Sequence, residues 1–218
     1  MYTSVMKELL AERPRLTENP LSEKIFIQGF DFNAGRANAS EIETAYKIVD
    51  AAQRVIPLVC TLPGNQDRTG VVMAITRREK GFPILTVQIG EVNQEDISYG
   101  LDGKLAKYTT FAYLKAKILQ DQPGFFSSAQ NEHRITSKRV ISSIGHVIPG
   151  GAIAFGNQVI SISAFKEANM DTAAALAIAV ESGIATKEQA IKLALNPKVK
   201  CNEFIKYGDR IIPQLLSK

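Results

Sequence analysis

Two apolar runs, residues 152–155 and 159–165, are joined by Gly156-Asn157, and this feature constrains the fold more than any other. Apolar runs on either side of such a turn predict a β-hairpin at the centre of a sheet. Asp171 follows at the start of an Ala-rich stretch that ends at Gly183. Its composition predicts a helix that Asp171 caps and that runs through Ser182.

Helical and strand patterns alternate along the rest of the chain. A capping box at Ser40 and Glu43, followed by an apolar stripe, predicts a helix that Pro57 stops. Further elements are expected on the same grounds: helices over 67–80, 104–120 and 186–195, and strands over 83–91 and 97–101. Because helices alternate with antiparallel hairpins, we expect an α/β fold in which helices cover an antiparallel sheet, and not a doubly wound parallel sheet.

The size and composition of the chain are those of one globular domain with appended elements. It has 218 residues, of which 45% are hydrophobic, and no low-complexity tract. The first residues lack the basic start and apolar stretch of a signal peptide, and no apolar run is long enough to cross a membrane. We therefore expect a cytoplasmic protein with no membrane partner. Cys60 and Cys201 are isolated, so neither a zinc site nor a disulfide framework is indicated.

The charge pattern argues against a nucleic-acid partner. The net charge is +4, but the 26 basic residues are spread along the chain and interleaved with acids. The compact basic runs, residues 77–80 and 138–139, are short and poor in neighbouring aromatic residues. We interpret both runs as solvated ends of helices.

The segment from Cys60 to Gly70 resembles the phosphate loop of cysteine-dependent phosphatases at its end, Gly-x-x-Asp-Arg-Thr-Gly. In that loop a thiolate and an Arg share one anion-binding cradle at a helix N-terminus. Seven residues separate Cys60 from Arg68, too many for the two to share such a cradle. The sequence favours instead a buried Cys60 at the end of a strand, with Asp67 capping the next helix.

His133 and His146 are the two histidines of the chain. Neither lies in a spacing typical of a metal site or a catalytic triad. His146 carries more weight as a candidate ligand because it precedes Gly150-Gly151, where glycines permit close backbone approach to a ligand. The alternative is a simple turn that enters a strand. Gly150-Gly151 lacks the Gly-x-Gly-x-x-Gly order, so it predicts no dinucleotide site.

A series of short motifs falls in the order of one known domain family. The motifs are Gly81-Phe82-Pro83-Ile84, Leu101-Asp102-Gly103, Leu114-Lys115-Ala116, Gly150-Gly151-Ala152-Ile153 and the acidic helix start Asp171. In this order they resemble the GlcG/HbpS-like haem-binding family, which also forms the C-terminal domain of some corrinoid adenosyltransferases. The resemblance covers about residues 40–182. The chain differs from the family pattern at residues 160–165, Ile-Ser-Ile-Ser-Ala-Phe, where the glycines that open the family's pocket are missing.

The resemblance implies a profilin-like three-layer sandwich that assembles into oligomers and binds haem or a related tetrapyrrole, or another planar acidic ligand. Lys115 or Lys104 would pair with the haem propionates, and His146, His133 or Tyr108 would be the axial donor to iron. The cofactor-binding residues implied by the resemblance are Asp102, Tyr108, Lys115, His146, Gly150 and Gly151, with His146 as the metal ligand.

These expectations divide the chain into an N-terminal arm (1–38), a GlcG/HbpS-like core domain (39–182) and a C-terminal helical extension (183–218). The arm carries Phe26, Phe30 and Phe32, which a compact core has little room to bury, so we expect a homo-oligomer.

Three functions follow as hypotheses. The first is non-catalytic binding or sensing of a small, tetrapyrrole-like ligand. The second is a small-molecule metabolic enzyme with an acid/base site near Asp102, Lys115 and His146. The third is an oligomeric structural subunit.

Overall fold

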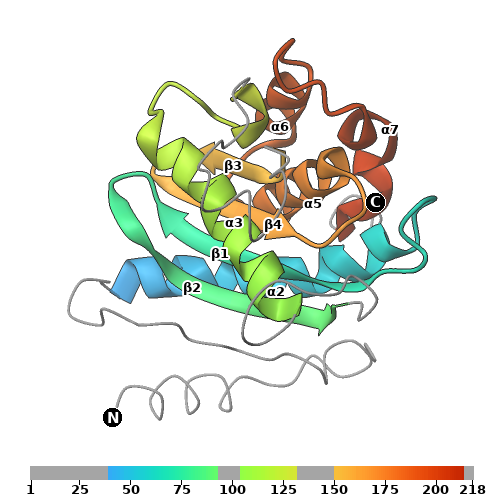
Figure 1. Cartoon of the computed structure of the whole chain (residues 1–218). Helices are drawn as coiled ribbons and strands as arrows, with labels where there is room; N and C mark the ends of the chain where they lie inside the picture. Colours follow the sequence, from blue (N-terminus) through green and yellow to red (C-terminus); the bar gives the residue numbers. More distant parts are fainter. Residues whose placement is uncertain (1–38, 93–103, 132–149, 214–218) are drawn as a thin grey trace.

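The computed structural model describes residues 39–92, 104–131 and 150–213 (Figure 1). The expected arm and the expected strand over 97–101 lie outside these residues. The described strands form one antiparallel sheet in the order β2-β1-β4-β3. Their bounds are β1 Thr69–Arg77, β2 Lys80–Glu91, β3 Ala152–Phe155 and β4 Gln158–Ser163. The predicted hairpin at Gly156-Asn157 is confirmed, and β4 pairs with β1 at the centre of the sheet.

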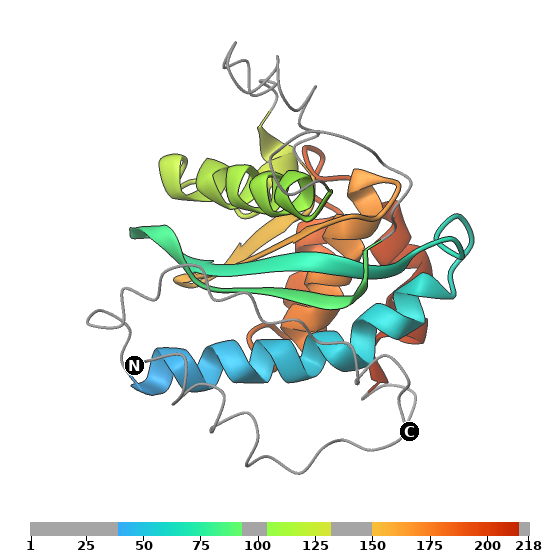
Figure 2. The ribbon, with the colours of Figure 1, turned by 60° about the horizontal axis from the view of Figure 1, so that its bottom comes forward.

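Helices cover both faces of this sheet. Helix α3 (Lys104–Asp121) lies on one face, and α2 (Ala39–Cys60) and α5 (Ala168–Glu181) lie on the other, as Figure 2 shows. Helices α6 (Lys187–Ala194) and α7 (Asn202–Ile211) follow, and α7 packs against α5. Leu193 and Phe204 from these last two helices belong to the same apolar core as the sheet. The expected antiparallel sheet covered by helices is therefore confirmed.

The expected helix over 67–80 is wrong, because this segment forms strand β1. Every residue from Gly70 to Arg77 is buried, since β1 is a central strand with helices on both faces. A strand buried on both faces has no polar side to alternate with its apolar one, so its sequence lacks the period of two residues. The segment is rich in Val, Ile and Thr, which favours a strand.

Three local predictions about helix ends are also wrong. Helix α2 begins at Ala39, one residue before the expected cap Ser40, and it continues past Pro57 to Cys60. Cys60 therefore ends a helix and not a strand. A proline inside a helix removes one backbone hydrogen bond and bends the axis, and the last turns of α2 in Figure 2 bend away from the line of the rest. Helix α5 begins at Ala168, so Asp171 lies inside its first turn and does not cap it.

The two faces of the sheet differ in side-chain size. Ile160 and Ile162 of β4 belong to the large core shared with α2 and α5. Ser161 lies between them in sequence and faces α3, where its Oγ donates a hydrogen bond to the backbone oxygen of Ala112 at 2.7 Å. Thr76 and Thr86 on the same face hydrogen-bond to Gln120 and Tyr113 of α3. Small and hydroxylated residues thus let α3 approach the sheet closely.

Arg78, in the turn after β1, holds the segment that follows α3. Its guanidinium donates hydrogen bonds to the backbone oxygens of Pro123 at 2.8 Å, Phe125 at 2.6 Å and Gly156 at 3.2 Å. It also lies over the ring of Phe126, 5.2 Å from the centroid. This segment leads into a short 3₁₀ helix, Ser128–Gln130. One side chain therefore joins the β1–β2 turn, the β3–β4 turn and the chain after α3.

We predict that Ser161→Val destabilises the protein more than Ser161→Ala does. Alanine removes one hydrogen bond to α3, which costs about 1 kcal/mol. Valine removes the same bond and adds two methyl groups under a helix that is already in contact, which costs a further ~1–3 kcal/mol. Urea unfolding of the three proteins measures both effects. Equal stability of the two variants would contradict the close approach of α3.

Candidate functional site

A buried ion pair joins α3 and α5 beyond the end of β4. Lys115 Nζ lies 2.7 Å from Asp171 Oδ2 and donates a second hydrogen bond to the backbone oxygen of Ile162 at 3.1 Å. The backbone N–H of Phe165 donates to Asp171 Oδ1 at 3.1 Å. The two side chains are only 5% and 4% exposed. Every charge-bearing atom of the pair thus has a partner inside the protein.

Lys115 reaches this position because its neighbours on α3 are small. Ala112 and Ala116 are buried on the same side of the helix, so the long Lys side chain can extend along the sheet toward α5. The alternative of an exposed Lys115 on the wet face of the helix is wrong, since the residue is 4% exposed. A second Lys–Asp pair of α3, between Lys117 and Asp121, lies on the solvent-exposed face of the helix, with both side chains more than half exposed.

Gly151 lies directly against this pair. Its φ is +112°, a conformation that residues with a Cβ rarely adopt. A Cβ there would lie 2.7 Å from Asp171 Cβ and 2.9 Å from Lys115 Nζ. The N–H of Gly151 donates to Thr172 Oγ1 at 2.9 Å. The Gly150-Gly151 turn therefore needs glycine both for its backbone conformation and for its contact with the two charged side chains.

Ala164, between β4 and α5, also has a positive φ of +129°. Such a conformation is unfavourable for a residue with a Cβ, and backbone strain of this kind gathers at ligand sites. Ala164 packs against Tyr108 of α3 and Val72 of β1. Gly151 thus lies against the Lys115–Asp171 pair, and Ala164 precedes Phe165, whose N–H donates to Asp171.

Burial raises the pKa of Asp171 from 3.8 to about 6. The charge of Lys115 and its hydrogen bond oppose this rise, as do the Phe165 N–H and, more weakly, the charge of Arg68. Because the pKa is higher in the folded than in the unfolded protein, protonation of Asp171 favours folding. The stability that this group contributes is fully present below about pH 4 and is lost as the pH rises through about 6.

The structure brings together some of the residues expected at the site. Lys115, Gly150 and Gly151 form one cluster, and Tyr108 lies near it through its contact with Ala164. Asp102, His133 and His146 lie outside the described residues. Asp171 was expected as a helix cap and as the acidic helix start of the family pattern, so it was missed as the partner of Lys115. The acidic residue in the first turn of the helix that follows the Gly-Gly hairpin was the signal that could have pointed to Asp171.

Among the positions expected to contact haem, those in the described part of the chain are not open in this arrangement. Side chains fill the space between α3 and β4, because Ser161 hydrogen-bonds directly to the helix backbone. Lys115 is paired with Asp171, and Tyr108 is 5% exposed. Within 39–92, 104–131 and 150–213, no three His, Cys, Asp or Glu side chains gather as a metal site requires. A bound tetrapyrrole stays a prediction.

The other candidate motif, Cys60 with Arg68, lacks a reactive thiol. Burial raises the pKa of Cys60 to about 11, so the thiol is protonated at neutral pH. A phosphatase nucleophile needs the opposite shift, toward the thiolate. This agrees with the spacing argument against a phosphate loop.

Comparison with known proteins gives no relative: no family model, no curated protein and no solved structure matches this chain. The resemblance to the GlcG/HbpS-like family therefore stays a prediction. None of the helices in the described part of the chain is both long enough and apolar enough to span a membrane.

We predict that Gly151→Ala is far more harmful than Gly156→Ala. Both glycines have positive φ, so both variants carry a backbone penalty of ~1–2 kcal/mol. Nothing lies within 4 Å of a Cβ at Gly156, whereas at Gly151 the new methyl group meets the ion pair. Urea unfolding should show a loss several kcal/mol larger for Gly151→Ala. Similar losses for the two variants would show that the pair does not depend on Gly151.

We predict that Lys115→Met costs ~3–5 kcal/mol of unfolding free energy at about pH 7.5, because it leaves the Asp171 carboxylate buried without its counter-charge. Part of the loss should return at about pH 5, where Asp171 takes up a proton. The double variant Lys115→Met/Asp171→Asn keeps an acceptor for Phe165 N–H and removes both charges. It should lie within ~1 kcal/mol of the parent.

The exposed pair Lys117–Asp121 gives the control for the variants of the buried pair. Lys117→Met/Asp121→Asn makes the same changes on the wet face of α3, where an ion pair contributes at most ~0.5 kcal/mol. A double variant of Lys115 and Asp171 as unstable as Lys115→Met alone would show that the buried charges themselves are needed for folding.

Proposed function

We propose that the protein is a non-catalytic binding or sensing protein for a small acidic ligand held beside the Lys115–Asp171 pair. The single observation that carries this proposal is the pair itself, buried against a glycine turn with positive φ. A buried ion pair adds little net stability, because desolvation of the charges offsets their attraction. Buried charges next to a strained backbone are instead typical of functional sites.

The charge balance favours an acidic ligand. Lys115 supplies a positive charge in contact with Asp171, and Arg68 adds a weaker positive influence, whereas Asp171 supplies one negative charge when it is ionised. Protonation of Asp171 as the pH falls through about 6 leaves Lys115 without this counter-charge. A ligand carboxylate can then take the place of the Asp171 charge. Binding should therefore respond to pH, as in a sensor. The carboxylates of a tetrapyrrole are one case of such a ligand.

The hydrogen bonds that hold the two side chains argue against a role as general acid or base. A general acid or base must reach a substrate atom within hydrogen-bond distance, yet each charged group of the pair is already held by a second hydrogen bond within the protein. Of the three residues expected in an acid/base site, Lys115 alone lies in the described part of the chain. The expected homo-oligomer likewise rests on the arm at 1–38, and it stays a prediction.

We predict that benzoate, a small planar carboxylate, binds about tenfold more tightly at about pH 5 than at about pH 7.5, because Asp171 is then protonated. Calorimetric titration of the full chain measures the change. Lys115→Met/Asp171→Asn should lose the binding and its pH dependence, whereas Lys117→Met/Asp121→Asn should keep both.

Haemin and its iron-free analogue, titrated at about pH 7.5 by absorption, extend the test to tetrapyrroles. Saturable binding of haemin that the Lys115→Met/Asp171→Asn variant loses would assign a tetrapyrrole to this site. Equal affinity of the parent and the variant for every carboxylate would remove Lys115 from the site. If no carboxylate binds saturably to the parent protein, the proposed function is wrong.

A further inference from the structure

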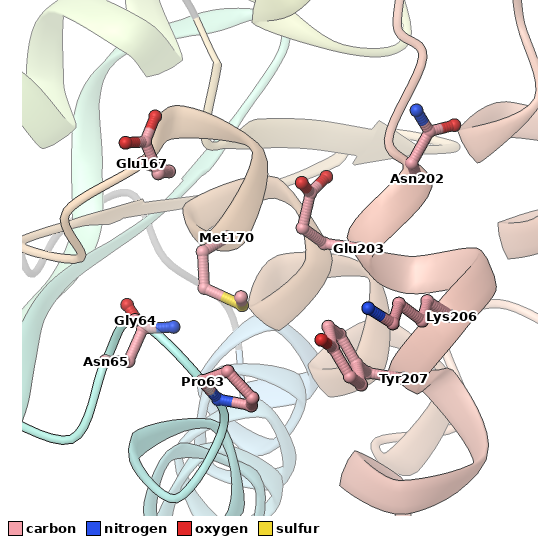
Figure 3. A pocket seen from close by; sticks show the side chains of 9 residues that line it. All are labelled: Pro63, Gly64, Asn65, Glu167, Met170, Asn202, Glu203, Lys206 and Tyr207. Carbon is pink, nitrogen blue, oxygen red and sulfur yellow. The ribbon is translucent and has the colours of Figure 1, made fainter.

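A pocket of about 350 Å³ lies between α5, α7 and the loop that follows α2. It is separate from the Lys115–Asp171 pair, and Figure 3 shows the side chains that line it. Its volume is at the small end of the range for ligand pockets. Pro63, Met170 and Tyr207 give it apolar walls, and Asn65 and Glu203 give it polar groups.

Asn65 is the first group in this pocket that points to a ligand. It is 2% exposed, and its backbone is fixed by hydrogen bonds to Leu62 and Arg68. Its side-chain amide has one donor group and one acceptor group. Figure 3 shows this amide at the pocket wall, opposite α7. A ligand in the pocket can therefore form a hydrogen bond with this amide.

Glu203, in the first turn of α7, is the second such group. Its Oε2 atom is buried and has no hydrogen-bond partner within the described residues. Lys206, one turn later in α7, does not supply one: its ammonium lies over the Tyr207 ring, 4.9 Å from the centroid. A buried carboxylate oxygen of this kind requires a donor, and a charged donor satisfies it best.

The overall charge of the lining indicates the class of ligand. Glu167 and Glu203 contribute two negative charges, and Lys206 contributes one positive charge. The lining therefore carries an excess of one negative charge. Apolar walls around the acceptor fit the carbon chain of an organic amine, and the volume exceeds what a bare metal ion needs. From these contacts we infer that the pocket binds a small primary amine, with its ammonium group at Glu203 Oε2 and a hydrogen bond to Asn65.

This site takes ligands of opposite charge to those of the proposed function, so the two can be tested apart. The probes are n-butylamine and 1,4-diaminobutane, with 1-butanol as the neutral isostere and butyrate as the anionic one. Heteronuclear NMR of the full chain reports binding through shifts of the amides around the pocket. We expect saturable shifts with the amines and none with the alcohol or the acid.

Two variants test the named contacts. Glu203→Gln keeps the shape of the side chain and removes its charge, and it should weaken amine binding about tenfold to a hundredfold. Asn65→Leu is close in shape and removes the hydrogen bond, and it should weaken binding about tenfold. Glu188→Gln makes the same change of charge on α6, at a fully exposed position, and should leave the affinity unchanged.

The remaining outcomes decide against the inference. No saturable shift with either amine would overturn it, as would equal binding of 1-butanol or an unchanged affinity in a folded Glu203→Gln protein. Lys115→Met/Asp171→Asn should bind the amines like the parent. Loss of amine binding in that variant would move the amine away from the pocket and also overturn the inference.

Discussion

The ion pair between Lys115 and Asp171 joins the two helical layers of the protein. Lys115 comes from α3 on one face of the sheet, and Asp171 comes from α5 on the other, so they meet where β4 ends. The contact requires a small residue at Ser161, which lets α3 lie on the sheet, and glycine at position 151, which leaves room for both charged groups. The pair therefore restricts the residues at positions 151 and 161, although it contributes little to stability by itself.

Local patterns predicted the elements that carry a turn, a periodic stripe or a cap in their own sequence. The hairpin at Gly156-Asn157, helix α3 and the capped helix after Thr186 were predicted correctly, because each has a turn, a periodic stripe or a cap in its own sequence. Strand β1 was missed because it is buried on both faces and lacks such a period. Pro57 was interpreted as a stop, yet the packing of α2 on the sheet keeps the helix intact around it.

The site could be predicted in part. The Lys-Ala and Gly-Gly motifs pointed to Lys115 and Gly151, which the structure brings into contact. The partner Asp171 lies 56 residues from Lys115 in the chain. Their pairing depends on how two helices pass the end of a strand, and no local pattern carries that information. The amine pocket was not predicted for the same reason, because Asn65 and Glu203 come from distant segments.

Arg78 has a consequence for how the sheet meets other chains. An edge strand with free backbone groups is a template for adding a strand from another molecule. Strand β3 is the shorter edge of this sheet, and the backbone N–H of Ala154 already donates to the oxygen of Phe126 at 2.9 Å. By holding Phe125 and Pro123, Arg78 keeps that segment along the edge. The protein thus shields β3 with its own chain, which protects this edge against strand exchange and fibrous aggregation.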